Sequence, residues 1–284
     1  MVQASMTDHL IQRRPPAATK LLAPRQEASD SPANAYHGPV KRYLLDHEAG
    51  SSTDALYDAA AQIIDNSNPE EGIPALAALL ASQHPDQPNF LIELGDARRH
   101  AGDTSGAIDD YRRALTLDPL SSRAQRRLGA ALASVGRLDE ARAVLGTAIE
   151  REPSNALLYY EQALVEARSG SAERAIADLR KALQLRPRFD AAQNTLGSIL
   201  AQSGDLDSAA TAFRAALTIN PYSADARANF ARLLASKGDW KQAAFHLNRA
   251  VQLDPANATL RADYAVALSQ LREGSQRTQN RARP

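Results

Sequence analysis

The chain has 284 residues, with 33 Lys and Arg residues against 33 Asp and Glu residues. This balance gives no overall field that would attract nucleic acid or an acidic membrane surface. The absence of cysteine excludes disulfides, thiolate metal sites, a cysteine nucleophile and covalently attached haem within this chain.

Residues 1–50 form the first segment, which is rich in proline and shows no sustained helical period. This composition predicts an extended or disordered N-terminal arm. Residues 1–16 lack the basic-then-apolar layout of a secretory signal, and no apolar run of the chain is long enough to span a bilayer. As written, the sequence therefore predicts a cytoplasmic chain without a membrane span.

Residues 51–87 contain the first apolar residues at helical spacing. One helix is predicted to end near Asn66, and a second is predicted from about 70 to 82. Pro74 is tolerable in the second helix because it lies in the first turn, where its missing N–H would have no partner. We interpret this segment as a degenerate helix pair that precedes a regular array.

A regular array is indicated by prolines that recur every 34 residues: Pro85, Pro119, Pro153, Pro187, Pro221 and Pro255. Between them the same kinds of residue return at the same offsets, which indicates a repeat protein. Five regular units are 88–121, 122–155, 156–189, 190–223 and 224–257. In each unit an apolar stretch stops at a glycine, as expected for a helix C-cap, and a second stretch runs to the proline. Each unit is therefore predicted to be two helices joined by a tight turn.

Small and large residues alternate inside the units where two helices must touch. Small residues stand at the eighth position of each unit, as in Gly95, and at two alanine positions of its second stretch. Large residues stand next to the eighth position and between the two alanines. Gln162 departs from this pattern, because the other units have leucine or phenylalanine there. One such helix pair leaves an apolar face exposed, so we expect stability to come from stacking of the units.

The period of 34, the small eighth residue, the two alanines with a large residue between them and the closing proline resemble the tetratricopeptide repeat (TPR) family. The resemblance implies an all-α fold: a right-handed alpha solenoid of TPR helix-turn-helix repeats, whose first helices line a concave groove. A C-terminal capping helix is predicted at 258–273, and a disordered basic tail at 274–284.

The sequence predicts no catalytic centre, no metal site and no cofactor. None of its six histidines stands in a metal-binding spacing, and its glycines belong to the repeat rather than to a phosphate loop. The resemblance implies instead a non-catalytic protein-protein interaction scaffold that binds a peptide or protein segment, whose identity the sequence does not give. Packing of such faces also supports self-association.

Candidate groove residues follow from the positions that face inward in the TPR family. They are Arg123, Arg126, Arg127, Tyr160, Asn194, Asn229 and Arg232. The arginines would bond carboxylates of an extended peptide and the asparagine amides would bond its backbone. The alternative is that these side chains are only the soluble lining of a scaffold. The family's two-carboxylate clamp is absent, because Thr259 and Asp263 stand where it needs Lys and Arg.

A second resemblance is confined to the arm. The segment from Met6 to Pro16, followed by Leu21 to Pro24, is similar to the junction of bacterial fusion proteins in which a multihaem c-type cytochrome domain precedes TPRs. It implies an alternative function: the C-terminal part of an electron-transfer protein that lacks its haem domain. His9 would then be a haem ligand in a longer, periplasmic fusion, and Met1 an internal start. The other interpretation is that the arm is an ordinary tail.

Overall fold

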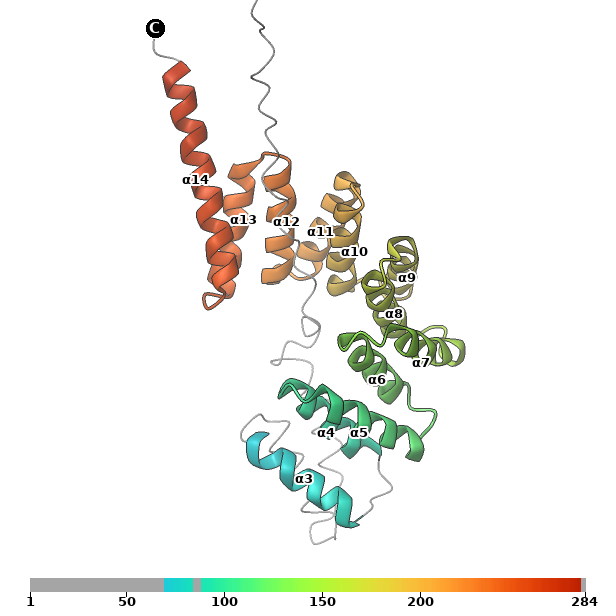
Figure 1. The fold of residues 1–284 in the computed structure, drawn as a ribbon. Coiled ribbons are helices and arrows are strands. Elements are labelled where there is room, and N and C mark those ends of the chain that lie inside the picture. The colour runs from blue at the N-terminus through green and yellow to red at the C-terminus, as the bar shows by residue number, and fades with distance from the viewer. Residues whose placement is uncertain (1–68, 84–87, 282–284) are drawn as a thin grey trace, which may run out of the picture.

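The computed structural model describes residues 69–83 and 88–281, with side chains described for 72–81 and 88–276. Over these ranges the chain forms twelve helices and no strand (Figure 1). The all-α class predicted from the sequence is confirmed. The arm at 1–50 and the first helix expected in the degenerate pair lie outside the described residues, and its second helix is α3 (Pro69–Gln83).

The five regular units each contain one pair of helices. The first helices are α4 (Pro88–His100), α6 (Ser122–Ser134), α8 (Ala156–Arg168), α10 (Asp190–Gln202) and α12 (Ala224–Ser236). The second helices are α5 (Thr104–Leu117), α7 (Leu138–Arg151), α9 (Ala172–Leu185), α11 (Leu206–Ile219) and α13 (Trp240–Leu253). A last helix, α14 (Ala258–Arg281), follows α13.

The turn inside each unit depends on a glycine with positive φ. Gly102 has φ 89°, and the corresponding glycine of each later unit has φ between 81° and 88°. Glycine adopts this left-handed conformation at little cost, which lets the first helix stop and the chain reverse. The next helix then starts on a cap: the side chain of Asp103 accepts a hydrogen bond from the Gly106 N–H at 2.9 Å. The two helices of a unit therefore lie antiparallel.

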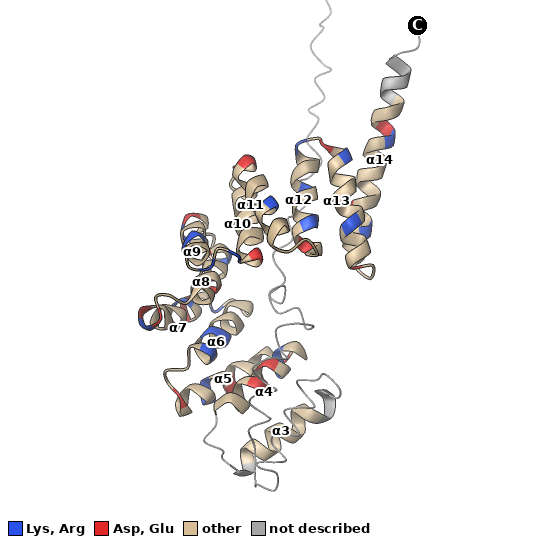
Figure 2. Cartoon of the chain, turned by 180° about the vertical axis from the view of Figure 1, so that it is seen from behind, with Lys and Arg blue, Asp and Glu red and all other residues tan. Residues whose placement is uncertain are grey.

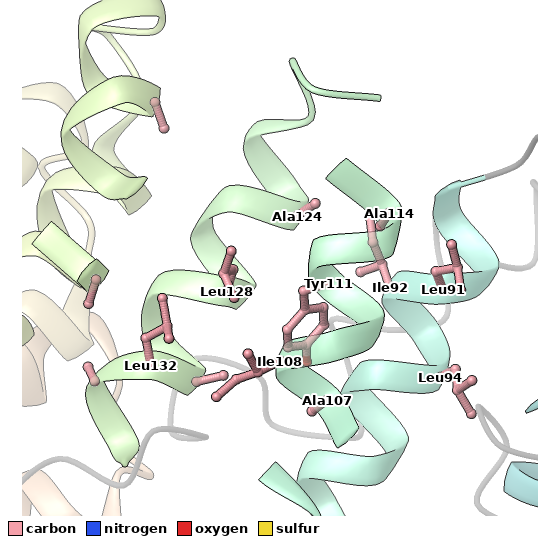
Figure 3. Close-up of a cluster of buried hydrophobic side chains, with 14 of the residues drawn as sticks. Leu91, Ile92, Leu94, Ala107, Ile108, Tyr111, Ala114, Ala124, Leu128 and Leu132 are labelled. Carbon is pink, nitrogen blue, oxygen red and sulfur yellow. The ribbon is translucent and has the colours of Figure 1, made fainter. Parts of the chain in front are cut away.

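The small residue at the eighth position lets the second helix lie directly on the first. A Cβ added to Gly95 would stand 2.6 Å from Cε1 of Tyr111, and one added to Gly197 would stand 2.8 Å from the Phe213 ring. Figure 3 shows Tyr111 of α5 between the side chains of α4 and those of α6. A methyl group at Gly95 or Gly197 would press on the aromatic ring, which explains why these two units have glycine there.

The helix pairs follow one another along an arc, with α6 and α8 toward its inner side and α7 and α9 toward its outer side (Figure 1). The apolar core is a series of clusters shared by adjacent units. One runs from α3 to α8, the next from α8 to α12, and the last two join α12 and α13 to α14. Each unit thus packs mainly on its two neighbours, as in other solenoids.

Gln162 is a weak point of this core. Its Oε1 is buried and has no hydrogen-bond partner. Leucine would fill a similar volume without burying a polar atom, so we expect Gln162→Leu to raise the free energy of unfolding by about 1–2 kcal/mol. Urea denaturation measures this change. Gln202→Leu, at an exposed position of α10, is the matched control and should change stability little; a less stable Gln162→Leu protein would contradict the prediction.

Helix α14 is longer than the predicted capping helix. It continues to Arg281, so the disordered tail predicted from residue 274 is wrong for 274–281. Gly274 alone does not end a helix whose other residues there are mostly good helix formers, such as Glu, Gln and Arg. The apolar side of α14 is as expected: Leu260 is buried, and Tyr264 and Leu268 pack against the cluster that contains Leu247 of α13.

Candidate interaction face

We name as the inner face the second, fifth, sixth, ninth and twelfth residues of the first helices, the positions expected from the sequence to face inward. All seven groove residues predicted from the sequence occupy these positions on α6, α8, α10 and α12. Five of the seven are buried, with exposed fractions between 0% and 9%: Arg127, Tyr160, Asn194, Asn229 and Arg232. Arg123 and Arg126 are partly exposed. The structure therefore uses most of these side chains inside the fold.

The first part of the inner face is an ionic cluster between α4 and α6. Arg127 Nε lies 3.1 Å from Asp96 Oδ2, in the geometry of an ion pair rather than of an aligned hydrogen bond. The Tyr111 hydroxyl donates to the other oxygen of Asp96 at 2.6 Å. Arg123, also on α6, donates a hydrogen bond to Glu93 of α4. Burial raises the pKa of Glu93, and Arg123 partly offsets that effect.

Helices α6 and α8 are joined by a second ion pair. Arg126 Nη1 donates to Glu161 Oε1 at 3.2 Å, and both side chains are less than one fifth exposed. Beside Glu161, Tyr160 points into the core: its ring centroid is 4.9 Å from that of Phe189, and burial raises its pKa. Tyr160 therefore contributes to packing between units more than to the surface.

The last part of the inner face is an amide cluster that joins α10, α12 and α14. Asn229 Nδ2 donates to Asn194 Oδ1 at 3.2 Å and to Ser198 Oγ at 3.4 Å. Arg232 Nη1 donates to Asn229 Oδ1 at 3.4 Å, and its Nε donates to Asp263 Oδ2 at 2.9 Å. Asp263 is the acid that fixes α14 to α12.

Sequence reasoning named these positions but missed the pairing between them. The paired residues are 30 or 31 apart, as in Glu93 with Arg123 and Arg232 with Asp263, or 35 apart, as in Arg126 with Glu161. The shorter separations equal one period of 34 residues minus one helical turn. The longer separation equals one period plus one residue. Opposite charges at such separations in a 34-residue repeat are the signal that would have predicted the contacts.

The described residues contain no cluster of three side chains that could hold a metal ion. Within the same part of the chain, no helix has both the length and the apolar character needed to cross a membrane. His9 and the rest of the arm lie outside the described residues. The haem-ligand role, the cytochrome-fusion alternative and the compartment therefore stay predictions.

Two family models match the chain, and both are described as tetratricopeptide repeat. One matches residues 57–122 and 160–224, and the other matches 98–164 and 200–249. Their combined span, 57–249, is continuous and covers more than half of the chain. A search among curated proteins gave no match.

Solved structures share the architecture. A thermophilic TPR protein of Thermus thermophilus is 23% identical with TM-score 0.57, and the match covers 64% of this chain and 98% of that one. PilW, a type IV pilus biogenesis factor, is 17% identical with TM-score 0.64, over 75% and 99%. A chain of the APC/C hetero-tetramer Cut9-Hcn1 is 18% identical with TM-score 0.67, over 81% and 45%. At these identities the likeness concerns the fold alone.

Proposed function

This chain belongs to the tetratricopeptide repeat family, and we propose that it is a non-catalytic scaffold that binds a peptide or protein segment on its inner face. The alpha solenoid predicted from the sequence is confirmed, and the family supports a role in protein interaction. The observation that carries the proposal is an inner face held by polar contacts, which join α4, α6 and α8 in one group and α10, α12 and α14 in another. A surface held by internal ion pairs loses little conformational freedom when a partner binds, which favours affinity.

The chemistry of the inner face favours a partner that brings apolar side chains. Leu157 and Leu164 of α8 are only half-buried, and Val266 of α14 is 56% exposed. A segment that covers them would remove apolar surface from water. Binding of such a segment leaves the ion pairs of the inner face intact, because each of its arginines keeps its own carboxylate.

Arg123 is the predicted groove arginine with most room for a second contact. Its side chain is 37% exposed although it already bonds Glu93. A carboxylate of the bound segment could share this guanidinium, which has five N–H donors. Self-association through these faces stays a prediction.

The proposal is tested by selecting ligands from a phage-displayed library of random peptides on the full chain. Selected peptides should bind at least about tenfold more weakly to Ala201→Arg and Val266→Arg, because a long cation at either inner-face position blocks the covered surface. Ala177→Arg, at an exposed position of the second helix α9, is the matched control and should bind normally.

Circular dichroism and thermal melts establish that the variants are folded. Selected peptides that bind both inner-face variants with wild-type affinity would place the ligand elsewhere on the molecule and overturn the proposal. Loss of binding in Ala177→Arg alone would do the same, because that residue belongs to a second helix.

A further inference from the structure

Four arginines, one on each of the last four helices, form a second charged surface. We name Arg214 of α11, Arg227 of α12, Arg249 of α13 and Arg261 of α14 the arginine row. Figure 2 shows basic residues on each of these helices in succession. None of the four occupies an inward position: Arg214 and Arg249 belong to second helices, and Arg227 and Arg261 are fourth residues of first helices. The row is therefore separate from the inner face.

Ring contacts and electrostatic effects indicate that Arg214, Arg227 and Arg249 lie near one another. The Arg214 guanidinium lies 5.5 Å from the centroid of the Phe230 ring, and the ring of His246 lies 4.9 Å from that of Phe230. Burial and the neighbouring charge of Arg227 lower the pKa of His246. Burial and the charge of Arg249 in turn lower the pKa of Arg227. The cations thus destabilise one another.

Three members of the arginine row donate to carbonyl or amide oxygens rather than to acids. Arg227 donates to the Pro221 carbonyl at 3.0 and 2.6 Å, and Arg249 donates to the Gln252 side chain at 2.9 Å. Arg261 donates to the Pro255 carbonyl. In the described part of the chain no ion pair joins any of the four to an acid. The contrast with the inner face is clear, because four arginines there each have a carboxylate.

Two exposed aromatic residues flank the arginine row. Tyr222 is 79% exposed and directly follows Pro221, whose carbonyl accepts the bonds of Arg227. Phe245 is 57% exposed, and its ring lies 5.3 Å from that of His246. Arginine and aromatic side chains that are exposed together are the residue types that dominate binding energy at protein interfaces. The surface therefore offers both charge and apolar contact.

We propose that the arginine row binds an extended protein segment that carries a carboxylate at every third residue. Packed helices lie about 8–10 Å apart, and the members of the row stand on four helices that follow one another in the chain. Three residues of extended chain span about 10 Å, which brings every third side chain to the next arginine. The segment's apolar residue covers Phe245. A polyanionic nucleic acid is the weaker candidate, because the 33 acidic residues of the chain cancel its 33 basic ones at long range.

The test uses the full chain and two fluorescein-labelled peptides that differ only in charge. One has aspartate at every third residue with one leucine and serine elsewhere, and the other has asparagine in place of aspartate. Fluorescence anisotropy should show binding of the aspartate peptide that weakens with salt. Arg214→Gln combined with Arg249→Gln should weaken it at least about tenfold. Both residues are exposed, so melting should be unchanged.

Arg168→Gln, at an exposed arginine of α8, is the matched control and should bind like the wild type. Equal binding of the two peptides, or equal losses in the control and the double variant, would overturn the proposal. Binding of a single-stranded oligonucleotide without binding of the aspartate peptide would also overturn it. Peptides selected on the inner face should be insensitive to the double variant, so failure here is separable from failure of the inner-face proposal.

Discussion

An Ala182→Arg variant should fail to form the cooperative central array. Ala182 of α9 is fully buried, as is the alanine at the same position of every other regular unit. Arginine at this position would overfill the contact between helices and bury a charge, and either effect destabilises strongly. We expect the free energy of unfolding to fall by more than about 3 kcal/mol. Far-ultraviolet circular dichroism during urea titration measures the loss.

The matched control for this variant is Ala177→Arg on the same helix. Ala177 is exposed, so the added side chain extends into water and stability should change by about 0.5 kcal/mol or less. An Ala182→Arg protein that unfolds as cooperatively, and at the same urea concentration, as the control would show that the contact between units is not where the structure places it.

Replacing Asp96 with alanine should lower the free energy of unfolding by about 3–5 kcal/mol. Asp96 is 4% exposed, and it holds both the Arg127 guanidinium and the Tyr111 hydroxyl. Its removal takes from the buried Arg127 a carboxylate that lies 3.1 Å away. Thermal and urea unfolding followed by circular dichroism measure the effect.

Asp207→Ala provides the comparison at the surface. Asp207 pairs with Lys237, but its side chain is 95% exposed, so the pair is screened by water and contributes about 0–1 kcal/mol. Equal losses in the Asp96 and Asp207 variants would contradict a structural role for the buried pair. A larger loss for Asp96 would indicate that the inner-face charges are part of the framework.

The fold was predictable because its controlling residues repeat. Prolines at an interval of 34 and glycines such as Gly102 mark the helix ends through backbone conformations that few other residues adopt. The exception is the end of α14, where no such residue marks a boundary and the helix runs to Arg281. Local chemistry predicts a helix end only where the chain contains a residue that forces one.

Periodicity names the residues of the inner face, but it does not predict their burial or their pairing. Helical periodicity places Arg127 and Asn229 on the inner side, yet it does not show that Asp96 and Asn194 of the preceding units are close enough to bind them. That knowledge requires the relative shift of neighbouring first helices, which depends on how the large residues pack. Tyr160 was expected from its position to contact a ligand, but its ring packs on Phe189 instead.

The ion pairs between units also fix the order in which the units follow one another. Removing residues 156–189 would preserve the period, but Arg126 would then stand 35 positions before Thr195 instead of Glu161. The helices would still stack, whereas a half-buried cation would lose its carboxylate. Units that look interchangeable in their alanines and glycines are therefore not modular parts. A unit moved or removed at one of these junctions would require a matching change in its new neighbour.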